Sequence, residues 1–224
     1  MNKEKHIIIF SHGFGVRKDD RGLLTDIAKA FPESATYLFD YFDVDEESKT
    51  LTICPFGKQV EKLVEVFKNA KAENPNAIID IIAHSQGTLI PPLARLEGVR
   101  KTILLTPVFD TGIERTIERY ISRPGSEINL EGVSKLYPLD GYTRLVPKEY
   151  WVERKEVKPF DLYNNYISKT ELIVINANQD AVLGIVDTSS LNEKIKVISL
   201  DGDHGFSGDA RGALIEKIKE IIWN

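Results

Sequence analysis

The sequence has almost no cysteine and lacks a long apolar run. Its 224 residues include one cysteine, Cys54, which excludes an internal disulfide and a cysteine-rich metal site. Without an apolar stretch long enough for a signal peptide or a membrane span, we expect a cytoplasmic protein. Acidic residues outnumber basic ones, 34 to 29, and the net charge of −5 argues against a nucleic-acid partner.

The composition is otherwise that of a soluble globular domain, with 42% hydrophobic and 28% charged residues. Short apolar runs alternate with stretches of helical periodicity, which predicts an α/β fold with a mostly parallel sheet and helices on both faces. About six strands are expected. The clearest predicted strands cover residues 7–10, 35–42, 78–82, 101–108, 171–177 and 194–200. The predicted helices cover residues 23–31, 56–71, 85–96 and 210–222.

The alternation breaks between residues 109 and 170, where the chain is rich in Arg, Glu, Pro and aromatic residues. This segment is too long for a simple connection in a compact domain, and such insertions are usually functional. We therefore expect a core made of residues 1–108 and 171–224, with residues 109–170 as a cap over the strand tips. The alternative is a peripheral subdomain with a small aromatic core of its own.

The chain is organised around Ile78–Thr88, where a run rich in isoleucine leads into a polar turn. The turn Ala83-His84-Ser85-Gln86-Gly87 matches the nucleophile elbow G-x-S-x-G, with Ala in place of the first Gly. Small residues flank the Ser in this motif because the strand reverses sharply into a helix. Pro91 and Pro92 lie within that helix and predict a kink or a short first segment.

A serine nucleophile needs a neighbouring base, and the chain has only four histidines. His204 lies in a loop between the last strand and the last helix, at the sheet edge that also carries Ser85. His6 lies before the first strand and His12 in the first loop. His84 directly precedes Ser85, and its side chain is expected to point away from Ser85. His204 is therefore the candidate base.

The base must itself be oriented by a carboxylate. Asp180 follows the strand at 171–177, and the order Ser85, Asp180, His204 is the chain order of α/β-hydrolases. Asp110, after the preceding strand, is the competing acid. Asp203 is disfavoured because neighbouring side chains in a loop rarely converge.

Acyl transfer also needs donors for the negative charge that develops on the carbonyl oxygen. One candidate is the backbone N–H of Gln86, directly after Ser85. The other is the backbone N–H of Phe14, in the glycine-containing loop His12-Gly13-Phe14-Gly15. The side chain of Phe14 then remains free to line a pocket.

These motifs resemble the α/β-hydrolase superfamily, and more narrowly the bacterial cinnamoyl and feruloyl esterases. The resembling stretches are residues 12–14, 23–31, 39–41, 83–87, 158–180 and 203–207. The resemblance implies nucleophile, acid and base roles for Ser85, Asp180 and His204, and oxyanion-hole roles for Phe14 and Gln86. The sequence differs from the family at Ala83, at the prolines after the elbow, and in starting almost at the first strand.

The sequence thus predicts a serine hydrolase that cleaves small-molecule carboxylic esters through an acyl-enzyme on Ser85, with no metal or other cofactor. A thioesterase or a hydrolase of small peptides would use the same residues beneath a different cap. A protein of this fold that binds a ligand without catalysis is the alternative from another class. We expect a monomer or a homodimer.

Overall fold

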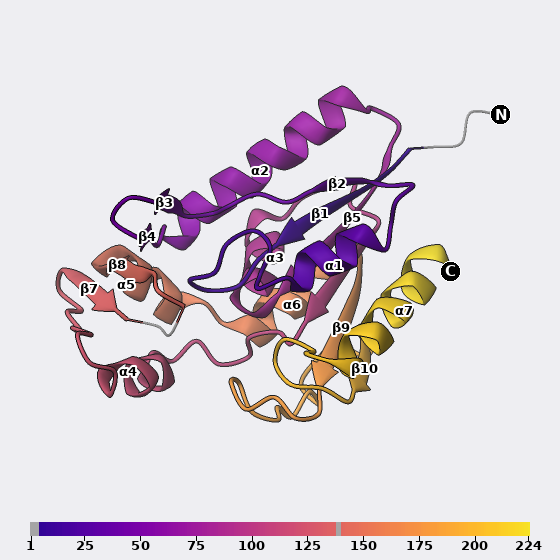
Figure 1. The fold of residues 1–224 in the computed structure, drawn as a ribbon. Helices are drawn as coiled ribbons and strands as arrows, with labels where there is room; N and C mark the ends of the chain where they lie inside the picture. Colours follow the sequence, from indigo (N-terminus) through magenta and orange to yellow (C-terminus); the bar gives the residue numbers. More distant parts are fainter. Residues whose placement is uncertain (1–4, 138–139) are drawn as a thin grey trace.

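The computed structural model describes residues 5–137 and 140–224, which build a sheet wound with helices (Figure 1). Six parallel strands form the central sheet in the order β10-β9-β6-β5-β1-β2. Their bounds are β1 His6–Ser11, β2 Ala35–Tyr37, β5 Ile78–His84, β6 Lys101–Leu105, β9 Glu171–Ala177 and β10 Lys196–Leu200. The predicted mostly parallel sheet of about six strands is confirmed.

Apolar side chains on both faces of the sheet explain why helices cover it on both sides. On β5, Ile82 faces a core that it shares with α1 (Leu23–Lys29) and α7 (Asp209–Trp223). Ile79 and Ile81 face the opposite core, with helices α2 (Phe56–Glu73), α3 (Ile90–Ala94) and α6 (Pro159–Tyr166). This alternation buries β5 on both faces, as expected for a central parallel strand.

A second sheet of four short strands, in the order β3-β4-β8-β7, takes β7 and β8 from residues 109–170 (Figure 1). Its strands are β3 Asp43–Asp45, β4 Thr50–Thr52, β7 Val133–Leu136 and β8 Thr143–Pro147. The pairing of β4 with β8 joins two segments that lie about ninety residues apart in the chain. β3 occupies the start of the acidic stretch at residues 43–49.

The segment at 109–170 also contains α4 (Glu114–Ile121), α5 (Lys148–Glu156) and α6. Its large aromatic residues pack into the same core as α2 and α3; they are Tyr150, Trp151, Tyr163 and Tyr166. The division of the chain into core and cap stays a prediction. Within the described residues, none of the helices is long and apolar enough to cross a membrane.

Two local expectations need correction. The strand predicted at 35–42 ends at Tyr37. The helix after Ser85 begins as a 3-10 turn, η1 (Ser85–Leu89), and α3 ends at Ala94 because Arg95 adopts a left-handed conformation with φ of 49°.

Candidate active site

The chain turns sharply at Ser85, where the buried strand β5 meets η1. Ser85 has a φ of 52°, a left-handed conformation that a non-glycine residue rarely adopts. A Cβ added at Gly87 would lie 2.4 Å from the carbonyl oxygens of Ser11 and His12. The elbow therefore needs glycine at this position because β1 passes directly against it. Ala83, fully buried, fits at the other small position.

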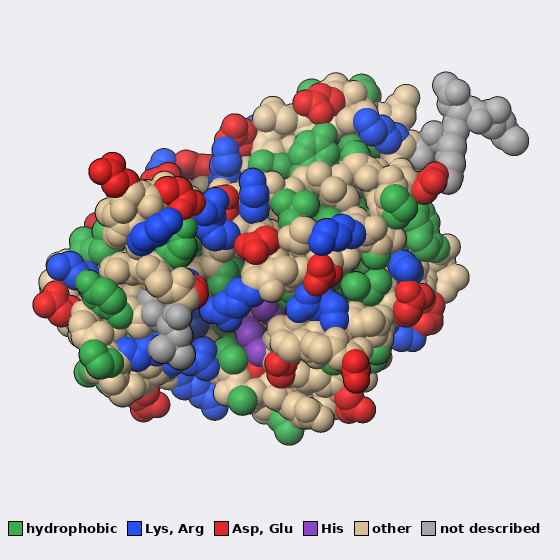
Figure 2. Space-filling view, in the orientation of Figure 1, with side chains coloured by type: hydrophobic (Ala, Val, Ile, Leu, Met, Phe, Trp, Pro, Cys, Tyr) green, Lys and Arg blue, Asp and Glu red, His purple; other side chains and the backbone are tan. Residues whose placement is uncertain are grey.

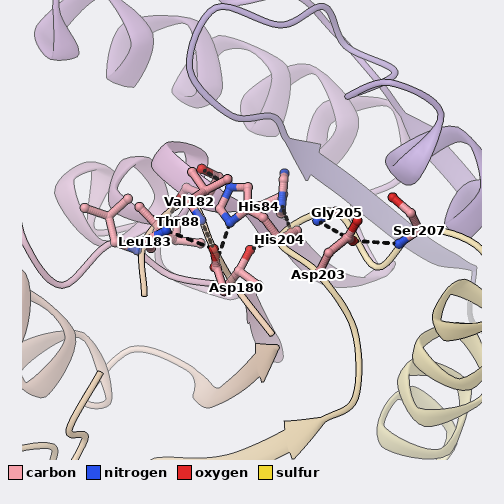
Figure 3. Close-up of polar contacts among 12 residues, drawn as sticks. His84, Thr88, Asp180, Val182, Leu183, Asp203, His204, Gly205 and Ser207 are labelled. Atoms are coloured by element: carbon pink, nitrogen blue, oxygen red, sulfur yellow. Dashed lines mark hydrogen bonds and ion pairs between the residues drawn. The ribbon is translucent and has the colours of Figure 1, made fainter. Parts of the chain in front are cut away.

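The side chains of Ser85, His204 and Asp180 form a continuous hydrogen-bonded chain. Ser85 Oγ lies 2.9 Å from His204 Nε2, and His204 Nδ1 lies 2.7 Å from Asp180 Oδ2. Figure 3 shows the Asp180–His204 contact at the ends of β9 and β10. His204 Nδ1 donates to the carboxylate, so Nε2 is left to accept the serine proton.

The surroundings of His204 and Asp180 favour the protonation states in which His204 can act as a base. Burial lowers the pKa of His204 below its ordinary value, although the hydrogen bond with Asp180 opposes this effect. Burial also disfavours ionised Asp180, but its bonds to His204 and to the N–H groups of Val182 and Leu183 outweigh it and lower the pKa of Asp180. Near neutral pH His204 is therefore neutral and Asp180 ionised.

The two competing carboxylates have other partners. Asp110 accepts a hydrogen bond from the backbone N–H of Gly112 at 2.8 Å. Asp203 accepts from the backbone N–H of Gly205 and of Ser207, and so shapes the turn around His204 (Figure 3). Asp180 is thus the carboxylate that contacts His204.

A second buried His–Asp pair lies against the first, and sequence reasoning missed it. His84 Nδ1 donates to Asp20 Oδ2 at 2.7 Å, and His84 Nε2 donates to the carbonyl oxygen of His204 at 2.9 Å. Both partners are acceptors only, so His84 carries a proton on each ring nitrogen and is a cation. Burial lowers the pKa of His84, but the charge of Asp20 and the hydrogen bonds to Asp20 and to the carbonyl oxygen of His204 together outweigh burial and raise the pKa.

The loop after β1 passes close to Ser85, as the expected oxyanion donors require. A Cβ added at Gly13 would lie 3.2 Å from Cβ and 3.6 Å from Oγ of Ser85. The N–H of Gln86 belongs to the first turn of η1, where backbone donors have no partner within the helix. The Phe14 ring packs against Tyr150, with centroids 5.3 Å apart. The donor roles of Phe14 and Gln86 stay predictions.

Ser85 and His204 line a pocket of about 150 Å³, close to the size of a cavity that holds benzene. Apolar walls come from Phe14, Val108 and Phe109. Figure 2 shows histidine side chains in this hollow, with Lys and Arg side chains beside it. Among the described residues, no group of three or more His, Cys, Asp or Glu side chains is placed to hold a metal ion.

Comparison with solved structures identifies the architecture. Est1E from Butyrivibrio proteoclasticus, described with ferulic acid bound, aligns over 99% of this chain and 90% of its own, with a TM-score of 0.72 and 18% identity. GrgF, an alpha/beta hydrolase from Penicillium sp. sh18, aligns over 97% of this chain and 89% of its own, with a TM-score of 0.68 and 19% identity. The chain has the α/β-hydrolase fold. No family model and no curated protein matches the sequence.

The α/β-hydrolase fold accounts for the convergence of Ser85, Asp180 and His204, because parallel strands bring their carboxyl ends to one edge. It does not account for Asp20, which is 5% exposed although it lies in a loop of charged residues. A left-handed φ of 46° directs the Asp20 side chain inward to the N–H of Gly13. No periodicity in the sequence signals such a position.

Proposed function

We propose that this protein is a serine hydrolase that cleaves carboxylic esters through an acyl-enzyme on Ser85. The observation that carries the proposal is the hydrogen-bonded chain from Asp180 through His204 to Ser85 in the wall of a pocket. The similarity to esterases supports it at the level of the fold.

In the first half of the reaction, Ser85 Oγ attacks the ester carbonyl carbon while His204 Nε2 takes the hydroxyl proton. The carbonyl oxygen becomes an oxyanion, which the backbone N–H groups of Phe14 and Gln86 would stabilise. As the tetrahedral intermediate collapses, His204 returns the proton to the leaving alcohol. Asp180 holds the imidazole in the required tautomer and stabilises its transient positive charge.

In the second half, a water molecule attacks the acyl-enzyme and His204 accepts its proton. Collapse of this second intermediate releases the carboxylic acid and returns the proton to Ser85. Each step conserves protons, and this chain's own residues supply the base, the acid and the oxyanion donors.

Hydrolysis of a p-nitrophenyl ester series from acetate to laurate, with methyl ferulate alongside, tests the proposal. The pocket volume favours short acyl chains and small aromatic acids. Ser85→Ala and Asp180→Asn should each lower kcat by about 10⁴-fold or more and leave the fold intact. A folded Ser85→Ala variant with near wild-type activity would show that the nucleophile is wrong. Hydrolysis of thioesters alone would move the substrate class to thioesters.

A further inference from the structure

Two buried arginines in the segment at 109–170 have very different surroundings. Arg144, 1% exposed, forms an ion pair with Asp140 and donates to the carbonyl oxygens of Gly15 and Tyr142. Arg154 is 7% exposed, and within the described residues it has no carboxylate partner. Arg144 thus has the partners that a buried guanidinium requires, whereas Arg154 lacks them.

The contacts of Arg154 are few, long and uncharged. One terminal nitrogen lies 3.4 Å from Gln86 Oε1 and 3.3 Å from the hydroxyl oxygen of Tyr150. Gln86 Oε1 already accepts a short hydrogen bond from Tyr150. The Nε atom of Arg154 is buried without a hydrogen-bond partner in the structure. A buried, unpaired charge is costly, so an arginine in this state is suited to an anionic ligand.

Arg154 also lines the pocket that contains Ser85 and His204. Its neighbour Gln86 directly follows Ser85 in the chain, and the guanidinium and Ser85 line the same pocket. The pocket is therefore the place from which an anion can reach Arg154.

The rest of the pocket wall has an excess of positive charge. Arg21, Arg115 and Arg119 line it together with Arg154. Arg115 and Arg119, on α4, donate to the backbone carbonyls of Leu183 and Val182. The two carboxylates in the wall are Asp20, which is paired with the cationic His84, and the exposed Asp110. This local excess contrasts with the net charge of −5 of the whole chain.

From this arrangement we propose that the substrate ester carries a second, anionic group, such as a carboxylate, and that Arg154 binds it. The guanidinium offers parallel N–H donors that match a carboxylate in two-point contact. Arg119 and Arg115 add positive charge at the pocket mouth and favour entry of an anion. This inference rests on the proposed ester hydrolysis and narrows its substrate class.

Two pairs of esters test the proposal and distinguish the acyl side from the alcohol side. The first pair is the 4-nitrophenyl hemiester of glutarate and neutral 4-nitrophenyl hexanoate. The second pair is carboxymethyl butanoate and neutral propyl butanoate. In at least one pair, kcat/KM for the charged ester should exceed that for the neutral ester by about tenfold or more. Equal or lower values for the charged ester in both pairs would overturn the proposal.

Variants then assign the preference to Arg154. Arg154→Met should lower the charged-to-neutral ratio by about tenfold or more, chiefly through KM, and Arg154→Lys should retain part of it. Lys155→Met removes the same charge from an exposed neighbour on α5 and should leave the ratio unchanged. A fall in activity that is equal for charged and neutral esters in Arg154→Met would assign Arg154 a structural role and overturn the proposal.

Two further measurements test the anion site even if Arg154→Met folds poorly or if the protein hydrolyses none of these esters. Arg119→Met changes an exposed side chain, so it should fold normally and lower the same ratio by a smaller factor. Calorimetric binding of glutarate to Ser85→Ala measures anion binding without turnover. Loss of that binding in Ser85→Ala/Arg154→Met supports the anion site even if no ester is hydrolysed. Equal binding, or none, in both proteins counts against it.

Discussion

The charge on two buried histidines, His12 and His84, follows from the atoms that their ring nitrogens face. His12 Nδ1 donates to the carbonyl oxygen of Gly13, and its Nε2 accepts from the N–H of Tyr41, so His12 is neutral. His84 donates from both nitrogens and is a cation. Its ring centroid lies 4.9 Å from that of His204, and this nearby charge opposes protonation of His204. His84 therefore tunes the base without touching the reacting atoms.

His84→Gln should shift the pH dependence of kcat/KM. The active form requires neutral His204, so activity rises as pH increases through the pKa of His204. In wild type that pKa is lowered, and activity extends below the ordinary histidine range. Loss of the His84 cation, which leaves Asp20 unpaired, raises the pKa of His204 and moves the acidic limb to higher pH.

His12→Gln is the matched control, because it replaces a buried neutral histidine of the adjoining loop. In His12→Gln, the acidic limb of the kcat/KM profile should keep the wild-type midpoint pH, even if kcat/KM itself changes. An unchanged midpoint in His84→Gln, or an equal shift in both variants, would contradict the tuning role of His84.

For individual residues, the sequence predicts those that belong to a recognisable motif or follow the chain order of a triad. Ser85, Asp180 and His204 were placed together because strand ends of a parallel sheet meet at one edge. Asp20 and Arg154 were missed as members of the site. Their positions depend on a left-handed backbone residue and on the packing of α5, which are properties of the folded chain.

Among the elements, the elbow has no room for a side chain at Gly87, whereas the C-terminal helix α7 has room for one at Gly212. A side chain at Gly87 would collide with the backbone of Ser11 and His12, at 2.4 Å. Gly212 lies exposed in α7, and a Cβ there would meet nothing within 4 Å. The same Gly→Ala substitution should therefore have opposite effects at the two positions.

Gly87→Ala should lower the free energy of unfolding by about 1–3 kcal/mol or more and abolish ester hydrolysis. Gly212→Ala should raise the free energy of unfolding by up to about 1 kcal/mol, because alanine favours helix, and leave hydrolysis unchanged. Urea denaturation and the ester assay measure both quantities. Wild-type stability and activity in Gly87→Ala would contradict the close approach of β1 to the elbow.

The elements that sequence reasoning identified are those with a strong local pattern. Short apolar runs predicted β1, β5, β6 and β9, and helical periodicity predicted α2 and α7. The second sheet was missed because its strands have three to five residues each and pair across long stretches of chain. Such strands are stabilised by tertiary contacts, which no short window of sequence displays.

For the whole molecule, the fold brings Ser85 and an excess of arginine to one pocket of an acidic protein. Residues 109–170 supply α4 and α5, which carry Arg115, Arg119 and Arg154 to that pocket. The parallel sheet positions Ser85, His204 and Asp180. We propose that the residues at the sheet edge carry out the hydrolysis and that residues 109–170 select the substrate.

Covalent labelling with a fluorophosphonate probe, followed by peptide mass spectrometry, tests the central claim most directly. The wild-type protein should be labelled on the peptide that contains Ser85. Ser85→Ala should lose this label, and folded His204→Gln should acquire it far more slowly, because the serine then lacks its base. A folded wild-type protein that remains unlabelled, or one labelled equally after Ser85→Ala, would contradict the assignment of Ser85 as the nucleophile.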